Sequence, residues 1–219
     1  MPESKSDASL DVRGLVLVPA VLTLGITLLR LAGELAHWSH RLFNPAAGGG
    51  GAIVGISWLP FIFGPYFALK LTRSGKGAAS LGKAFGSLGL GIVLFILGGF
   101  VAFRLRFPGK EFIEYLLMAL AASMVNWGWP ALFKVLIAYG YAARIPVAIL
   151  MFFAIRGHWG THYDALPPGY SSPGSFSAAY WEIAFLPQMI FWPVMTVLVG
   201  TLLGLLVVSV RGLFHAPAA

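Results

Sequence analysis

The chain contains several apolar segments long enough to cross a lipid bilayer as helices. The clearest of them runs from Phe85 to Phe103 and contains no charged residue. A spanning helix needs about 20 apolar residues, and its backbone polar groups are all bonded within the segment. Charged residues make up 11% of the sequence, against about 25% in soluble domains. The sequence therefore predicts an all-α, polytopic bundle of transmembrane helices.

We expect about six spans in one membrane domain, residues 14–211, between a polar N-terminus (1–13) and a short tail (212–219). The predicted spans are 14–35, 52–71, 85–103, 112–138, 142–155 and 180–208. The first is interpreted as a retained helix and not as a removed signal peptide. A cleavage site near Ala36 would put Glu34 at a position that requires a small residue.

The apolar stretch 112–155 requires a turn. As one helix it would be roughly 66 Å long, which is enough for two crossings and too long for one. We place the turn at residues 139–141, because two tyrosines around a glycine are typical of a membrane interface. Trp127, Trp129 and Pro130 offer an alternative turn.

Proline interrupts two of the predicted spans. Pro60 and Pro65 fall in the second span, and Pro187 and Pro193 fall in the sixth. Proline lacks the N–H group that a helix interior requires, so we expect these two helices to be kinked or broken.

Glycine is concentrated in the third span, where residues 86, 89, 91, 98 and 99 are all glycine. Glycine permits close contact between membrane helices. We therefore expect this span to lie at the centre of the bundle. The glycine-rich helices also suggest contacts with other membrane subunits or with a second copy.

The charge distribution predicts the orientation. With six spans, the side that holds both termini carries nine basic and three acidic residues, a net charge of +6, and the other side has a net charge of +1. Cytoplasmic loops carry an excess of Lys and Arg. We therefore expect both termini in the cytoplasm and the chain in a plasma or inner membrane. The same rule explains the overall charge of +7 without a nucleic-acid partner.

Titratable residues gather on the predicted outer side. His158, His162 and Asp164 follow the fifth span, and Glu34 and His37 end the first. Imidazole nitrogens and carboxylate oxygens suit zinc, copper or non-haem iron. The hypothesis is that these five residues meet and hold a divalent transition metal. The alternative is that they pack the membrane interface and fix the loop to the first helix by hydrogen bonds alone.

No motif in the sequence identifies a reaction. There is no Walker A loop, no His-Glu-x-x-His pattern and no cysteine. Ser57 lacks the second glycine of a nucleophile elbow and is interpreted as a packing residue. The sequence therefore favours a non-enzymatic membrane protein, either a small transporter or an accessory subunit. The alternative is a membrane enzyme or metal-binding protein with its site on the outer face.

Overall fold

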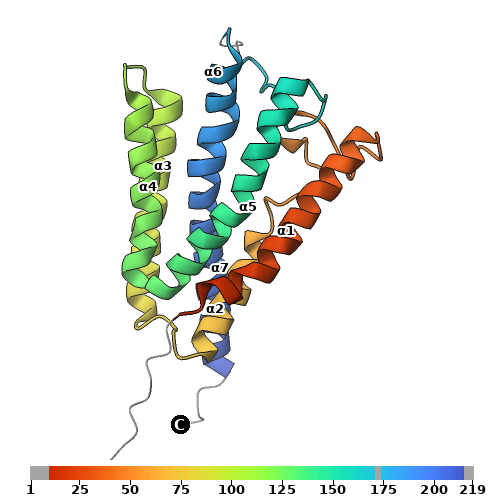
Figure 1. Cartoon of the computed structure of the whole chain (residues 1–219). Helices are drawn as coiled ribbons and strands as arrows, with labels where there is room; N and C mark the ends of the chain where they lie inside the picture. The colour runs from red at the N-terminus through yellow and green to blue at the C-terminus, as the bar shows by residue number, and fades with distance from the viewer. Residues whose placement is uncertain (1–9, 171–173, 215–219) are drawn as a thin grey trace, which may run out of the picture.

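The computed structural model describes residues 10–170 and 174–214, which are helical and contain no strand. The elements in chain order are α1 (Val12–Leu35), a 3₁₀ turn (Ala47–Gly49), α2 (Pro60–Arg73), α3 (Leu81–Arg104), α4 (Lys110–Gly128), α5 (Pro130–Gly157), α6 (Phe176–Tyr180), two π-helical turns (Trp181–Phe185 and Pro187–Phe191) and α7 (Trp192–Phe214) (Figure 1).

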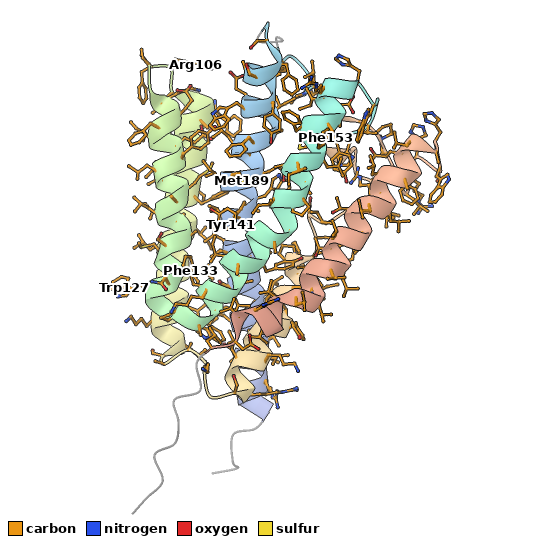
Figure 2. All side chains as sticks on the ribbon, in the orientation of Figure 1. Arg106, Trp127, Phe133, Tyr141, Phe153 and Met189 are labelled. Atoms are coloured by element: carbon orange, nitrogen blue, oxygen red, sulfur yellow. The ribbon has the colours of Figure 1, made fainter. Side chains whose placement is uncertain are left out.

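Among the described residues, four helical segments are long and apolar enough to cross a membrane: α1, α3, α5 and the continuous stretch Phe176–Gly212. Large apolar side chains on their outward faces are exposed, including Val18 (62%) and Phe103 (81%). Figure 2 shows mostly carbon atoms along these faces. Apolar surface of this extent is unfavourable in water and favourable in lipid, which fits a membrane protein.

Helix α5 is the central helix of the bundle, and the expectation that the third span is central is wrong. The most apolar window of α5 is 56% buried, against 33% for α3. Helix α5 contacts α1, α2, α4 and α7, whereas α3 forms an antiparallel pair with α4 at one edge (Figure 1).

The reason is that only some of the glycines of α3 face another helix. A Cβ on Gly91 would lie 2.7 Å from the carbonyl oxygen of Ala121 in α4, and Gly98 also faces α4. Glycines 86, 89 and 99 have no atom within 4 Å of such a Cβ.

The chain turns between α4 and α5 at Trp129, so the predicted turn at residues 139–141 is wrong and the alternative is right. Pro130 disfavours a helical conformation at the residue before it, and Trp129 has φ −147° and ψ 80°. The Trp129 indole is 1% exposed and donates a hydrogen bond to the carbonyl oxygen of Lys76 at 2.9 Å. Tyr139 is buried inside α5 instead, with its hydroxyl 2.8 Å from Thr23 Oγ1. The predicted limits 112–138 and 142–155 are replaced by 110–128 and 130–157.

The second predicted span, 52–71, is helical only from Pro60 onward. Proline suits the first position of a helix, so Pro60 begins α2 and does not kink it. Pro65 lies inside the helix. The 14 residues of α2 are about 21 Å long, less than the roughly 30 Å of a hydrocarbon core. Residues 52–59 are irregular and form the last part of the connection between α1 and α2.

Helix α2 packs closely on α7 through glycine. A Cβ on Gly64 would overlap the backbone of Gly200, and one on Gly204 would lie 2.8 Å from the Ala68 Cβ. The Gly200–Gly204 spacing therefore serves a contact within the chain.

The sixth predicted span, 180–208, is continuous but perturbed. Its two π-helical turns cover residues 181–191, and Pro187 begins the second of them. Pro193 lies at the start of α7 without breaking it. A π-helical turn widens the helix and is frequent at functional sites. Here it places Gln188, which is 7% exposed, in the protein interior.

Candidate functional site

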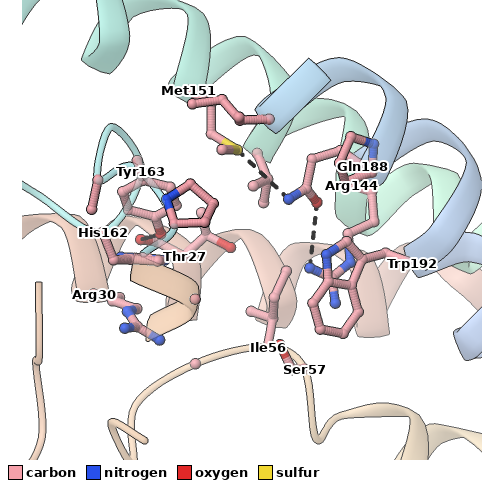
Figure 3. A pocket seen from close by; sticks show the side chains of 17 residues that line it. Thr27, Arg30, Ile56, Ser57, Arg144, Met151, His162, Tyr163, Gln188 and Trp192 are labelled. Atoms are coloured by element: carbon pink, nitrogen blue, oxygen red, sulfur yellow. Dashed lines mark hydrogen bonds between the residues drawn. The ribbon is translucent and has the colours of Figure 1, made fainter. Parts of the chain in front are cut away.

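A cavity of about 220 Å³ lies among α1, α5, the loops that follow them and the π-helical turns (Figure 3). The first of these loops, residues 36–59, precedes α2, and the second begins at residue 158 after α5. The side chains that bear on its chemistry are Thr27, Arg30, Ile56, Ser57, Arg144, Val147, Met151, His162, Tyr163, Ile183, Gln188 and Trp192.

Arg144 lies near the middle of α5 and lines this cavity with a side chain that is only 4% exposed. Its guanidinium carbon is 4.1 Å from the centre of the Trp192 ring, a cation–π contact. Its Nη1 is 3.4 Å from Gln188 Oε1, which is long for a hydrogen bond. Within residues 10–170 and 174–214, no carboxylate forms an ion pair with it. An arginine carries five N–H donors, and most of those of Arg144 have no acceptor among the described residues.

Arg30 lines the same cavity but is neutralised. Its Nε donates to Glu34 Oε1 at 2.7 Å, one turn along α1. Its Nη2 donates to the carbonyl oxygens of Asn44 and Gly49, at 3.0 and 3.1 Å. Gly49 has φ +86°, and a Cβ there would lie 2.9 Å from the guanidinium. The four consecutive glycines at positions 48–51 therefore allow the loop to lie close against Arg30.

Glu34 also binds the loop that follows α5. Its carboxylate accepts hydrogen bonds from the backbone N–H and the ring Nδ1 of His162, both at 2.8 Å to Oε2. Burial lowers the pKa of His162 and the nearby Arg30 guanidinium acts in the same direction, while the hydrogen bond to Glu34 opposes them. The imidazole is therefore neutral at pH 7, with Nδ1 as the donor. Arg144 supplies the uncompensated positive charge of the cavity.

The five predicted metal ligands do not come together. Glu34 and His162 meet, so the expected contact between the first helix and this loop is present. Asp164 instead accepts hydrogen bonds from the backbone N–H groups of Gly160 and Thr161, at 2.9 and 2.8 Å. His37 and His158 are exposed and adopt the left-handed conformation, with φ 51° and 50°.

Across the described part of the chain, no group of three or more His, Asp or Glu side chains is arranged to hold a metal ion. The physical reason is that hydrogen bonds within the protein occupy both carboxylates. The glutamate bonds Arg30 and His162, and the aspartate closes a turn of its own loop.

Arg144 and Trp192 are site residues that the sequence did not predict, whereas Gln188 is recognisable in the sequence as a polar residue within an apolar span. The sequence-based topology placed Arg144 at a membrane surface, because the turn was expected at residues 139–141. With the turn at Trp129, Arg144 lies near the middle of a 28-residue apolar helix, and a charge at that position is the sequence feature that points to it. A charged residue at such a position is a functional-site hypothesis by default.

Among the described residues, the one serine that lines the cavity is not paired with a base. Ser57 and His162 both line it, but no hydrogen bond joins them in the described structure, and Figure 3 shows their side chains apart. Nucleophilic catalysis needs the nucleophile and its base within hydrogen-bond reach. The Glu34–His162 pair therefore acts as a structural contact in this arrangement.

Together, the fold and the cavity define an all-helical protein with four helices of membrane-spanning length and a buried cationic site. A scan against protein-family models and searches of curated proteins and of solved structures find no match.

Proposed function

We propose that the protein is a non-enzymatic integral membrane protein of the small-transporter class, which binds a small anion beside Arg144. The observation that carries the proposal is the buried guanidinium without a carboxylate partner among the described residues. An unpaired buried charge is unfavourable by several kcal/mol, and a bound anion would offset that cost. The stacking on Trp192 holds the guanidinium in place for such a ligand.

The direction of the helices supports six crossings with both termini in the cytoplasm. The starts of α1 and α3 and the ends of α2 and α7 lie at the same end of the bundle (Figure 1). That end includes Arg13, Lys70, Arg73 and Lys83. With Arg144 assigned to the helix interior, basic residues on the terminal side still outnumber acidic residues eight to three, as the positive-inside rule requires of a cytoplasmic face.

The second crossing supports a transporter over a simple structural subunit. It combines irregular chain, residues 52–59, with the short helix α2. Transporters bind substrates where broken helices expose backbone groups to a cavity inside the membrane domain. In this chain Gly55, Ile56 and Ser57 of the irregular part line the cavity.

Thermal unfolding of the purified full chain in detergent tests the proposal, with chloride, inorganic phosphate and a short monocarboxylate as probes. We expect at least one anion to raise the melting temperature of the wild type, because a ligand stabilises the state that binds it. Arg144→Gln should abolish this increase. Arg156→Gln is the matched control, since Arg156 is an exposed arginine in the last turn of the same helix.

Two outcomes would contradict the proposal. One is that no anion stabilises the wild type. The other is that Arg144→Gln responds as strongly as the wild type. If Arg144→Gln fails to fold, Arg144→Lys keeps the charge and loses the fork of donors, so it should retain a weaker response.

A further inference from the structure

We infer that the anion bound in this cavity is a small monocarboxylate with a short apolar tail. The inference rests on the proposed anion site and names its ligand class. Three properties of the cavity support it: its charge, the N–H edge of the Arg144 guanidinium that Trp192 leaves uncovered, and the apolar side chains among its lining residues.

The charge of the cavity matches a ligand with a single negative charge. Among its lining residues are two arginines and one histidine, and none is acidic. Arg30 is neutralised by Glu34 from behind the cavity wall, at 2.7 Å. His162 donates to the same carboxylate. One positive charge, that of Arg144, is left for the ligand.

The geometry of Arg144 favours a planar anion. Trp192 covers one face of the guanidinium, so a ligand binds through the N–H edge. Two parallel N–H groups of arginine match the two oxygens of a carboxylate. Gln188 lies beside this edge, and its Nε2 is 3.6 Å from Met151 Sδ, which is a weak acceptor. A carboxylate oxygen is a stronger acceptor for the same N–H group.

The remaining walls suit an apolar tail. Ile56, Val147, Met151 and Ile183 come from three different segments and line the cavity together with the polar groups. The volume of about 220 Å³ is below the roughly 300–1,000 Å³ of common ligand pockets, so the tail must be short. One edge of the Arg144 guanidinium pairs with two oxygens, so the other oxygens of a phosphate would need donors from elsewhere in the cavity. Arg30 already uses Nε and Nη2 for Glu34, Asn44 and Gly49.

Competition between three probes tests the ligand class in the full chain: butyrate, its neutral analogue butyramide, and inorganic phosphate. Binding is followed by the melting temperature and by the change in tryptophan fluorescence, with Trp192→Phe as the control that identifies the signal. We expect butyrate to bind at least tenfold more tightly than phosphate, and butyramide to give no shift. Arg144→Gln should weaken butyrate binding by about tenfold to a hundredfold, as expected for a hydrogen bond to a charged group.

Tail recognition is tested by Ile183→Ala, which leaves Arg144 unchanged and enlarges the apolar end. We expect the preference to shift from butyrate toward hexanoate. If phosphate binds as tightly as butyrate and both depend on Arg144, the monocarboxylate inference is overturned while the anion site stands. If butyramide binds as tightly as butyrate, the charge argument fails. If no anion binds the wild type, both this inference and the proposed function fail.

Discussion

The carboxylate of Glu34 accepts two hydrogen bonds from His162, one from its backbone N–H and one from its ring Nδ1, across 128 positions of the chain. Glu34 is 3% exposed. It also bonds Arg30, which holds the glycine-rich loop. This one carboxylate therefore fixes two loops that form walls of the cavity, and the stability of that arrangement depends on the protonation of His162.

We predict that the folded protein loses stability as the pH falls below about 6.5, the usual pKa of histidine. The pKa of His162 is lowered in the folded state, chiefly by burial, so the fold favours the neutral ring. This contribution is fully present above the unfolded pKa of about 6.5 and is lost as pH falls through the lower folded pKa. Melting temperatures measured from pH 8 to pH 5 check it.

The control for this prediction is His162→Gln, which keeps a donor for Glu34 and does not titrate. As the pH falls, the melting temperature of the wild type should decrease more than that of His162→Gln. If the wild type instead gains stability relative to the variant in acid, His162 forms a favourable ion pair with Glu34, and the predicted direction of the pH dependence is wrong.

We predict that Gly91→Ala destabilises the protein by about 1–3 kcal/mol, the usual cost of overpacking. The added Cβ would lie 2.7 Å from the carbonyl oxygen of Ala121, so α3 and α4 must separate. Gly89→Ala is the matched control, because no described atom beyond its own stretch of helix lies within 4 Å of its Cβ. Its effect should be neutral or stabilising, since alanine favours helix by up to about 1 kcal/mol. Equal melting temperatures for the two variants would contradict the packing of α3 on α4.

We predict that Trp129→Phe lowers stability by about 1 kcal/mol, the usual net value of a hydrogen bond. The variant keeps an aromatic ring but loses the indole N–H that binds the carbonyl oxygen of Lys76. Trp127→Phe is the control, because Trp127 is 63% exposed. The melting temperature of Trp129→Phe should fall below that of Trp127→Phe. An equal effect would mean that this hydrogen bond does not stabilise the turn.

The proposed topology predicts the position of reporter domains. A reporter fused after Ala219 or inserted at Gly75, between α2 and α3, should be cytoplasmic. A reporter inserted at Gly109, between α3 and α4, should lie on the other side. The physical reason is that one crossing, α3, separates Gly75 from Gly109, and three crossings separate Gly109 from Ala219. An external C-terminal reporter would mean an odd number of spans or the inverted orientation, and either would overturn the arrangement.

The sequence determines that this is a helical membrane protein, because a bilayer sets requirements on each segment separately: its length, its apolar composition and the pairing of its backbone polar groups. A segment such as Phe85–Phe103 is long and apolar enough to span, and a helix satisfies its backbone polar groups within the segment. Proline has local effects too: a π-helical turn begins at Pro187, although the helix is continuous there and not broken. The contact of Glu34 with His162 was foreseen from the expected position of both residues on one side of the membrane.

Only the tertiary structure decided where the chain turns, which glycines are in close contact and which charge is left unpaired among the described residues. Two turns were compatible with the stretch 112–155, and burial of Tyr139 together with the Trp129–Lys76 hydrogen bond selects the one at Trp129. The glycines of α3 look alike in sequence, yet only those that face α4 are in close contact. The cavity depends on segments that are far apart in the chain, and among the described residues Arg144 lacks a carboxylate partner because of what the fold places around it. Burial and pairing of a charge are properties of its three-dimensional surroundings, and no local pattern determines them.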